Sequence, residues 1–313
     1  MSHVYSKILV TGGAGFIGSH LVDRLLEKGL EVTLIDDLSS GNLENVRHHT
    51  SKKDFHFIQG DIRNFNLVKR TVKEADALFH EAAVLSCTDS WKSLIHLNQV
   101  NVNGTLTLLK ACLDSNVKRF IYASSAAVYG ETNIQPQHED LTPKPISPYG
   151  VSKLSAEQYV QVFHKLYGLE TVCLRCFNVY GPRQAYGPYS GVTINFINQI
   201  SNNKPPIIYG DGEQTRDFVN IKDVVNANML ALAKKSAVGE AFNIGTGVST
   251  RINELAEILQ QIMNKTDIKP MYSDARPADI QHSRANINKA KNILGYDPKI
   301  PLRNGLDELV KWY

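Results

Sequence analysis

The chain has 313 residues, 34 lysines and arginines against 31 aspartates and glutamates, and a formal net charge of +3. This length allows one large α/β domain with a satellite lobe, or two domains that share an interface. The small charge argues against a nucleic-acid surface, and no segment approaches the roughly 18 apolar residues that a membrane span needs. Because a short polar lead passes directly into a strand-like run, we expect a cytoplasmic protein without a membrane anchor.

Strand-like runs alternate with helix-length segments over the first 176 residues. The runs are KILVTG, EVTLID, DFHFIQGD, DALFHEA, RFIYASS and ETVCLR. This alternation is typical of a parallel sheet covered on both faces, so we predict an α/β, Rossmann-type doubly wound sheet. We assign residues 1–176 to that domain and expect 217–247 to return to it. The remainder of 177–313 should form a smaller C-terminal lobe that binds the substrate.

A glycine-rich turn joins the first strand to the first helix. In TGGAGFIGSH, the spacing of Gly12, Gly15 and Gly18 suits a backbone loop that binds a dinucleotide pyrophosphate at a helix N-terminus. The alternative is a turn that only caps the helix. The second strand ends at Asp36, where a carboxylate can accept hydrogen bonds from the adenosine ribose. Asp37 follows with no arginine beside it, so a 2′-phosphate would meet two carboxylates and NAD is favoured over NADP.

Later strand ends should complete the cofactor crevice. GDI at residues 60–62 ends the third strand, and EAA at 81–83 ends the fourth. Asp61 either accepts from the adenine amino group or caps a helix that begins near Asn64.

The cysteines and histidines do not predict a metal site. Cys173 and Cys176 form a C-x-x-C, but in the alternating run ETVCLRC residues three apart point to opposite faces. We interpret them as two buried thiols. The histidines show no H-E-x-x-H or other ligand spacing, so we predict no bound metal.

Two segments, ASSAAVYG and SPYGVSK, carry the candidate chemistry. Ser125 ends the fifth strand, and Tyr149 and Lys153, four residues apart, share one face of a helix that starts with a proline. A free tyrosine has a pKa of about 10. The Lys153 ammonium and the positive nicotinamide ring should lower it, while Lys153 also holds the nicotinamide ribose. Ser125 would hydrogen-bond the reacting oxygen, so that Tyr149 takes a proton while a hydride leaves the same carbon for NAD.

With these motifs, the chain resembles the extended short-chain dehydrogenase/reductase family, and within it the UDP-hexose 4-epimerases. The resemblance runs nearly end to end, through TGGAGFIGSH, DDLSSG, GDI, SSAAVYGE, SPYGVSK, RCFNVYGPRQ, YGDGEQTRDFVNIKDV and RPADIQHS. It implies a UDP-sugar substrate and the catalytic residues Ser125, Tyr149 and Lys153. The residues expected to bind NAD are Gly12, Gly15, Phe16, Ile17, Gly18, Asp36, Asp37, Asp61, Ile62, Ala82, Ala83, Tyr149, Lys153 and Phe177. Those expected to bind the UDP-sugar are Ser86, Ser125, Asn178, Val192, Tyr209, Arg216, Arg276, Asp279 and Ser283.

Two alanines after Ser125 narrow the reaction. Members of the family that dehydrate or decarboxylate the sugar place acidic residues just after the catalytic Ser or Thr, because a proton must move at a neighbouring carbon. Ala126 and Ala127 cannot move a proton. The resemblance therefore implies oxidation at C4, rotation of the 4-keto sugar and return of the hydride. The alternatives are a 4,6-dehydratase of nucleotide-sugars, another NAD-dependent sugar-nucleotide oxidoreductase, or a catalytically silent NAD-binding protein.

The resemblance also implies a gate to the sugar pocket. The residue four beyond Asp279 borders the sugar, where a tyrosine excludes a 2-acetamido group and a small residue admits it. Ser283 occupies that position, so we predict turnover of the N-acetylated pair of sugars alongside the plain hexoses. The alternative is a polar loop residue with His282 turned inward. The segment SCTDSWK departs from the usual Val-Pro-x-Ser after Ser86, which leaves its sugar contacts open.

Finally, the resemblance implies a homodimer. Helices near 98–114 and 149–167 pair into a four-helix interface in the family. In the first of them, Val102, Leu106, Leu109 and Leu113 recur at helical spacing.

Overall fold

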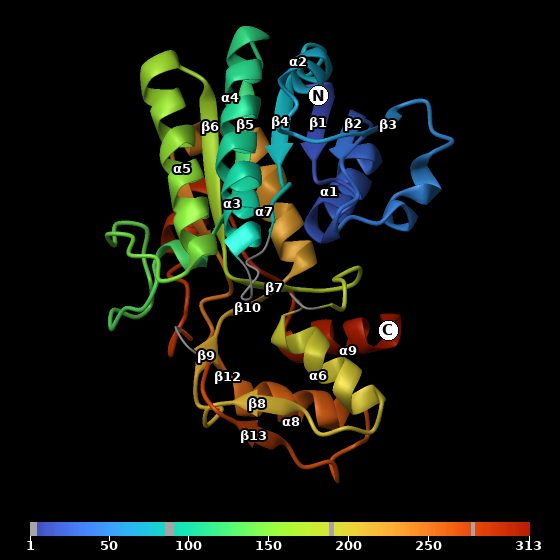
Figure 1. The fold of residues 1–313 in the computed structure, drawn as a ribbon, viewed down its shortest axis with the longest axis vertical. Coiled ribbons are helices and arrows are strands. Elements are labelled where there is room, and N and C mark those ends of the chain that lie inside the picture. Colours follow the sequence, from blue (N-terminus) through green and yellow to red (C-terminus); the bar gives the residue numbers. More distant parts are fainter. Residues whose placement is uncertain (1–4, 85–90, 188–190, 277–278) are drawn as a thin grey trace.

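The computed structural model describes residues 5–84, 91–187, 191–276 and 279–313. Its main feature is a seven-stranded parallel sheet in the order β11-β6-β5-β4-β1-β2-β3 (Figure 1). The strands are β1 (Lys7–Thr11), β2 (Glu31–Asp36), β3 (Phe55–Gln59), β4 (Ala77–His80), β5 (Arg119–Ser125), β6 (Glu170–Cys176) and β11 (Ala241–Ile244). The strand order reverses between β1 and β4, and ligands of such sheets bind outside the carboxyl ends at that point. The predicted doubly wound fold is confirmed.

Helices cover both faces of this sheet. One face carries α2 (Phe65–Val72), α4 (Thr105–Asp114) and α5 (Pro148–Tyr167), and the other carries α1 (Phe16–Glu27) and α7 (Ile221–Ala233) (Figure 1). A further helix, α3 (Trp91–Asn98), leads into α4 through a π-helical stretch, Gln99–Gly104. Alternation along each strand feeds two hydrophobic clusters: Ile8 and Val10 pack with α1 residues, whereas Leu9 packs with residues of α4 and α5.

A smaller lobe lies below the carboxyl ends of the strands in Figure 1. Its helices are α6 (Val192–Ser201), α8 (Ile252–Ile262) and α9 (Leu302–Trp312). Three short strand pairs support them: β7 (Asn178–Tyr180) with β10 (Phe218–Asn220), β8 (Ile207–Tyr209) with β13 (Met271–Ser273), and β9 (Thr215–Arg216) with β12 (Thr250–Arg251). In α8, Ile252, Leu255 and Leu259 are buried, and they pack against residues of α6 and α9.

The chain returns to the main sheet after its first excursion into the smaller lobe. Helix α7 packs on α1, and β11 adds beside β6 in parallel register. The short strand β10 pairs with β7 instead, outside the main sheet. The division at residue 176 remains a prediction.

Two properties of the described residues bear on the sequence predictions. Cys173 is buried and Cys176 half-buried, and both are free thiols. Among residues 5–84, 91–187, 191–276 and 279–313, no helix is long and apolar enough to cross a membrane.

Candidate active site

The glycine turn forms a close-packed cradle between β1, α1 and the end of β4. Gly12 has a φ of +68°, and a Cβ there would lie 2.6 Å from the backbone nitrogen of Ala82. Gly18 likewise leaves no room for a Cβ against the Gly12 carbonyl. Gly15 precedes the first turn of α1, where Phe16 and Ile17 begin the helix. This cradle fits a dinucleotide whose pyrophosphate approaches backbone N–H groups.

The acidic residues at the ends of β2 and β3 flank the cradle. Asp36 is buried and accepts backbone hydrogen bonds from Ala14 (3.0 Å) and Leu38 (2.8 Å), whereas Asp37 is exposed. Burial raises the pKa of the Asp36 carboxyl, and the two N–H bonds oppose that rise. Asp37 is open to solvent at the edge where the adenosine ribose is expected.

Asp61 has a partner that the sequence analysis missed. The Nε of Arg63 donates to both of its carboxylate oxygens, at 3.0 and 2.9 Å, and these bonds lower the pKa of Asp61. The alternative role of Asp61 as a helix cap is wrong, because the side chain of Asn64 accepts from Leu67 and caps α2. In the sequence, the arginine two positions beyond Asp61 could have indicated this pair. Beside this pair, Ile62 is buried.

Ser125, Tyr149 and Lys153 come together at the carboxyl end of β5. Ser125 ends the strand, accepts from the Ala127 N–H (3.2 Å) and hydrogen-bonds the phenol of Tyr149. Tyr149 lies in the first turn of α5, and Lys153 follows one turn later. The Nζ of Lys153 lies 5.9 Å from the centroid of the Tyr149 ring and donates to the Ala123 carbonyl at 2.7 Å. The predicted grouping is thus present in the protein.

The expected lowering of the Tyr149 pKa is not found in the chain by itself. Burial raises the pKa of Tyr149 to about 12, with the hydrogen bond of Ser125 opposing the rise. Burial also lowers the pKa of Lys153 to about 8. The expectation relied on the Lys153 ammonium and the positive nicotinamide ring, whereas burial is the largest influence on the Tyr149 pKa in the chain by itself.

Glu81, at the end of β4, is a second residue that the sequence analysis missed. Its Oε1 is buried and has no hydrogen-bond partner among the described residues. Burial raises the pKa of Glu81 to about 7, and the charge of Lys153 opposes that rise. Ala82 and Ala83, which the sequence analysis selected from the same EAA motif, follow directly after it. The signal was a carboxylate at a strand end otherwise lined by small residues.

The two serines of ASSAAVYG have separate tasks. Ser124 points into the protein and donates to Glu157 of α5 at 2.5 Å. Glu157 is fully buried and pairs with Arg175 of β6 at 2.6 Å, and Arg175 also donates to the hydroxyl of Tyr129 at 2.9 Å. This network fixes α5 against β5 and β6, and so holds Tyr149 near Ser125.

The predicted substrate residues lie in the smaller lobe and at its junction with the sheet. Arg216 pairs with Asp279 at 2.6 Å, and the guanidinium of Arg276 stacks 3.9 Å from the centroid of the Tyr209 ring. The remaining predicted substrate positions are Asn178 in β7 and Val192 at the start of α6, while Phe177, predicted to bind NAD, is buried after β6. Ser86 lies outside the described residues.

Ser283 faces inward. It is 6% exposed, and its Oγ lies 3.5 Å from Oε1 of Gln137. His282 is exposed and contacts Thr215 at 3.1 Å, so the alternative in which His282 turns inward is wrong. Nearby, Asp217 is fully buried and accepts bonds from Thr246, Gly247 and Ala285, which ties the strand of Arg216 to the segment of Ser283.

Comparison with known proteins identifies the family. The model of the NAD dependent epimerase/dehydratase family matches residues 8–245. The chain belongs to this family. The resemblance seen in the motifs is therefore confirmed. The activity of this family depends on NAD.

Among relatives within the epimerase/dehydratase family, UDP-glucose 4-epimerase of Mycolicibacterium smegmatis is 35% identical over 309 residues, which cover 98% of both chains. UDP-N-acetylglucosamine 4-epimerase from Methanobrevibacter ruminantium, solved with UDP-N-acetylmuramic acid, is 40% identical with a TM-score of 0.92 over 98% of this chain and 97% of that one. UDP-glucuronic acid 4-epimerase from Bacillus cereus, solved with UDP-glucuronic acid and NAD, is 35% identical with a TM-score of 0.92 and 98% coverage of both. Dehydratases also match: dTDP-D-glucose 4,6-dehydratase of Bos taurus is 34% identical over 98% of this chain and 88% of its own.

Proposed function

We propose that the protein is an NAD-dependent 4-epimerase of UDP-sugars, an isomerase. The observation that carries this proposal is the grouping of Ser125, Tyr149 and Lys153 beside the glycine cradle. Ala126 and Ala127 follow Ser125 directly in the chain. That grouping suits proton transfer at one alcohol, and the alanines offer no second acid or base. Relatives that carry the name of UDP-sugar 4-epimerase support the same reaction. A dehydratase would need an acidic group where Ala126 and Ala127 stand.

When bound, NAD supplies the acceptor and donor of a hydride at C4 and a positive ring charge near the phenol. The chain supplies the proton chemistry. Ser125 would hydrogen-bond the O4 oxygen. As the phenolate, Tyr149 would take the proton from O4 and later return it. Lys153, which now donates to the Ala123 carbonyl, would hold the nicotinamide ribose and lies beside the ring of Tyr149. The cradle of Gly12, Gly15 and Gly18 would hold the pyrophosphate.

The smaller lobe would hold the UDP-sugar. Arg216 and Arg276 are the guanidinium groups for the diphosphate, since arginine binds phosphate in bidentate fashion. The salt bridge to Asp279 aims Arg216. Ser283 lacks the ring that a tyrosine would place at this position, so the pocket should accept a 2-acetamido group. Both the N-acetylglucosamine and N-acetylgalactosamine forms and the plain hexoses would then be substrates.

We also propose a homodimer through α4 and α5. On α5, Val151, Tyr159, Val162 and Leu166 are between 40% and 69% exposed and follow one stripe. On the predicted helix near 98–114, Val102 and Leu109 are buried in the protein's own core, at 8% and 0% exposed, so these two residues do not contribute to the interface. The cytoplasmic location and the absence of nucleic-acid partners remain predictions.

An assay that separates UDP-hexose epimers, run without added NAD, tests the function. We expect purified protein to carry NAD and to interconvert UDP-glucose with UDP-galactose, and UDP-N-acetylglucosamine with UDP-N-acetylgalactosamine. A requirement for stoichiometric NAD with accumulation of NADH would indicate a dehydrogenase instead. A 4-keto-6-deoxy product would indicate a dehydratase, and no turnover would indicate a silent NAD-binding protein.

A further inference from the structure

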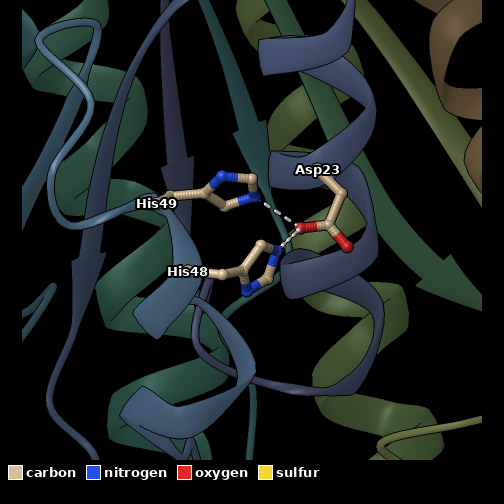
Figure 2. A group of neighbouring side chains, drawn as sticks. All are labelled: Asp23, His48 and His49. Carbon is tan, nitrogen blue, oxygen red and sulfur yellow. Dashed lines mark hydrogen bonds and ion pairs between the residues drawn. The ribbon is translucent and has the colours of Figure 1, made fainter.

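Three side chains far from the reacting groups converge on one point between α1 and the segment that follows β2. Asp23 lies on α1, and the neighbouring residues His48 and His49 lie in a short 3-10 turn. Figure 2 shows both imidazole rings pointing at the same carboxylate oxygen. The Oδ1 of Asp23 lies 3.0 Å from Nε2 of His48 and 2.6 Å from Nε2 of His49. No ligand spacing is visible in the sequence, because Asp23 lies 25 residues before His48.

The environment fixes this convergence. His49 is buried and its ring lies 5.8 Å from that of Phe55, whereas the side chain of His48 is 52% exposed. The two imidazole centroids are 3.9 Å apart, at an interplanar angle of 44°. Arg183 binds the other oxygen of Asp23 at 2.8 Å, which leaves Oδ1 aimed at the rings.

We propose that Asp23, His48 and His49 form a binding site for a divalent transition-metal ion, with Zn²⁺ as the best-suited ion. Two imidazole nitrogens and one carboxylate oxygen are ligand types that Zn²⁺ accepts, with a water as the fourth ligand. The three atoms lie within 4.8 Å of one another. Bonds of about 2.0–2.1 Å to a tetrahedral ion place neighbouring ligands about 3.3 Å apart, so small side-chain shifts suffice.

The ring protons can move to accommodate the ion. Metal binding through Nε2 requires each neutral ring to carry its proton on Nδ1. The Nδ1 of His49 is buried and has no hydrogen-bond partner among the described residues, so it is free to carry the proton, and the bond to the ion would replace the present hydrogen bond from Nε2 to Asp23. The salt bridge from Arg183 supports the ligating carboxylate from behind. Its positive charge should also make the site weaker than a four-ligand structural zinc site.

A bound ion would join the cofactor helix to the segment that covers the glycine turn. In that segment, Asn42 donates from its backbone and Asn45 from its side chain to the Ala14 carbonyl, at 3.0 and 2.9 Å. The expected consequence is stabilisation of this corner of the sheet.

Titration of Zn²⁺ into chelator-treated protein without a histidine tag tests the site, followed by calorimetry and by the visible bands of Co²⁺. We expect one ion per chain, tetrahedral Co²⁺ bands, and a rise in Tm of about 4 °C at a hundredfold excess over Kd. His48→Ala, at an exposed position, should weaken binding at least tenfold and abolish the bands and the rise. His56→Ala removes another histidine, whose side chain is 50% exposed, and should leave zinc binding, the Co²⁺ bands and the rise in Tm unchanged.

The results that would overturn the site are specific. Absence of binding in the wild type, or equal zinc affinity in wild type and His48→Ala, shows that the three groups are only a hydrogen-bonded cluster. Asp23→Asn provides a second test through the carboxylate, with circular dichroism to confirm that the variant folds. Epimerase activity is not a readout in either case, so failure of the proposed function leaves this test unaffected.

Discussion

Tyr149 is the residue on which the proposed proton transfer depends. Tyr149→Phe removes the hydroxyl but keeps the ring in the first turn of α5, so the fold and bound NAD should be retained. We expect turnover to fall by roughly 10²- to 10⁴-fold, the usual contribution of a positioned acid or base. Steady-state epimerisation with NAD content measured in parallel checks this. Tyr159→Phe, at a 42% exposed position of the same helix, is the matched control. Equal turnover in wild type and Tyr149→Phe would remove Tyr149 from the reaction.

Glu81 should make stability depend on pH near neutrality. Burial raises its pKa from 4.5 to about 7. Because the folded state holds this proton more tightly than the unfolded state, stability is lost as pH rises between these two values. In protein freed of NAD, Glu81→Gln should therefore gain relative to wild type across that range, by at most about 3 kcal/mol. Urea unfolding at several pH values measures the difference. A difference that stays constant with pH would contradict the assignment.

Ser283 is the position at which sugar choice should be decided. Ser283→Tyr should strongly reduce activity on the acetamido sugars and spare UDP-glucose, because a clash excludes a large substrate. A spare methyl-sized space costs a small substrate only about 1–3 kcal/mol, so the wild type should accept both kinds. Ratios of kcat/KM for the two substrate pairs measure this, with Ser283→Ala as the small-residue control. Equal loss on both pairs would show that Ser283 is not the gate.

The relative placement of two residues can be predicted from sequence where they are close in the chain. The spacing of Tyr149 and Lys153 is one helical turn, so sequence alone places them on one face. Glu81 escaped notice because its significance depends on Lys153 from a different element. The Tyr149 pKa was misjudged for a related reason: burial is a property of the whole environment and no motif displays it.

At the scale of elements, the buried pair of Glu157 and Arg175 joins α5 to β6. Glu157→Gln leaves the Arg175 guanidinium buried without a countercharge, which should cost about 3–5 kcal/mol of unfolding free energy. The exposed pair of Arg24 and Glu27 gives the control, since Glu27→Gln should change stability by less than about 1 kcal/mol. Urea denaturation of both variants gives the comparison. Similar small losses would mean that the buried network does not hold α5.

Six of the seven strands of the main sheet were predictable because each is a strand-like run between turn signals, whereas β11 was covered only by the expected return of 217–247 to the domain. The two- and three-residue strands of the smaller lobe were not, since pairs such as β9 with β12 depend on contacts between distant segments. In the sequence, segments of that region such as NKPPIIYGDG are rich in Gly, Pro and Tyr. The first dimer helix shows the same limit: Val102 and Leu109 fit the helical period, but the period does not say whether a residue packs inward or against a partner.

At the scale of the whole molecule, the exposed stripe of α5 should be covered by a second copy. Leu166 is 69% exposed and lies one turn from Val162, while Leu106 and Leu113 of α4 are half-buried. Leu166→Glu places a charge in the middle of an apolar contact, and a charge buried without a partner is costly. We expect the wild type to sediment at micromolar concentration with twice the 34.9 kDa of one chain, and Leu166→Glu to sediment as a single chain. Leu43→Glu, at a 38% exposed position outside α4 and α5, should remain a dimer.

If the wild type is a monomer, or if Leu166→Glu and wild type sediment alike, α5 is not the interface. Because Ser125, Tyr149 and Lys153 come together within one chain, the monomeric variant should keep its epimerase activity where its fold is intact.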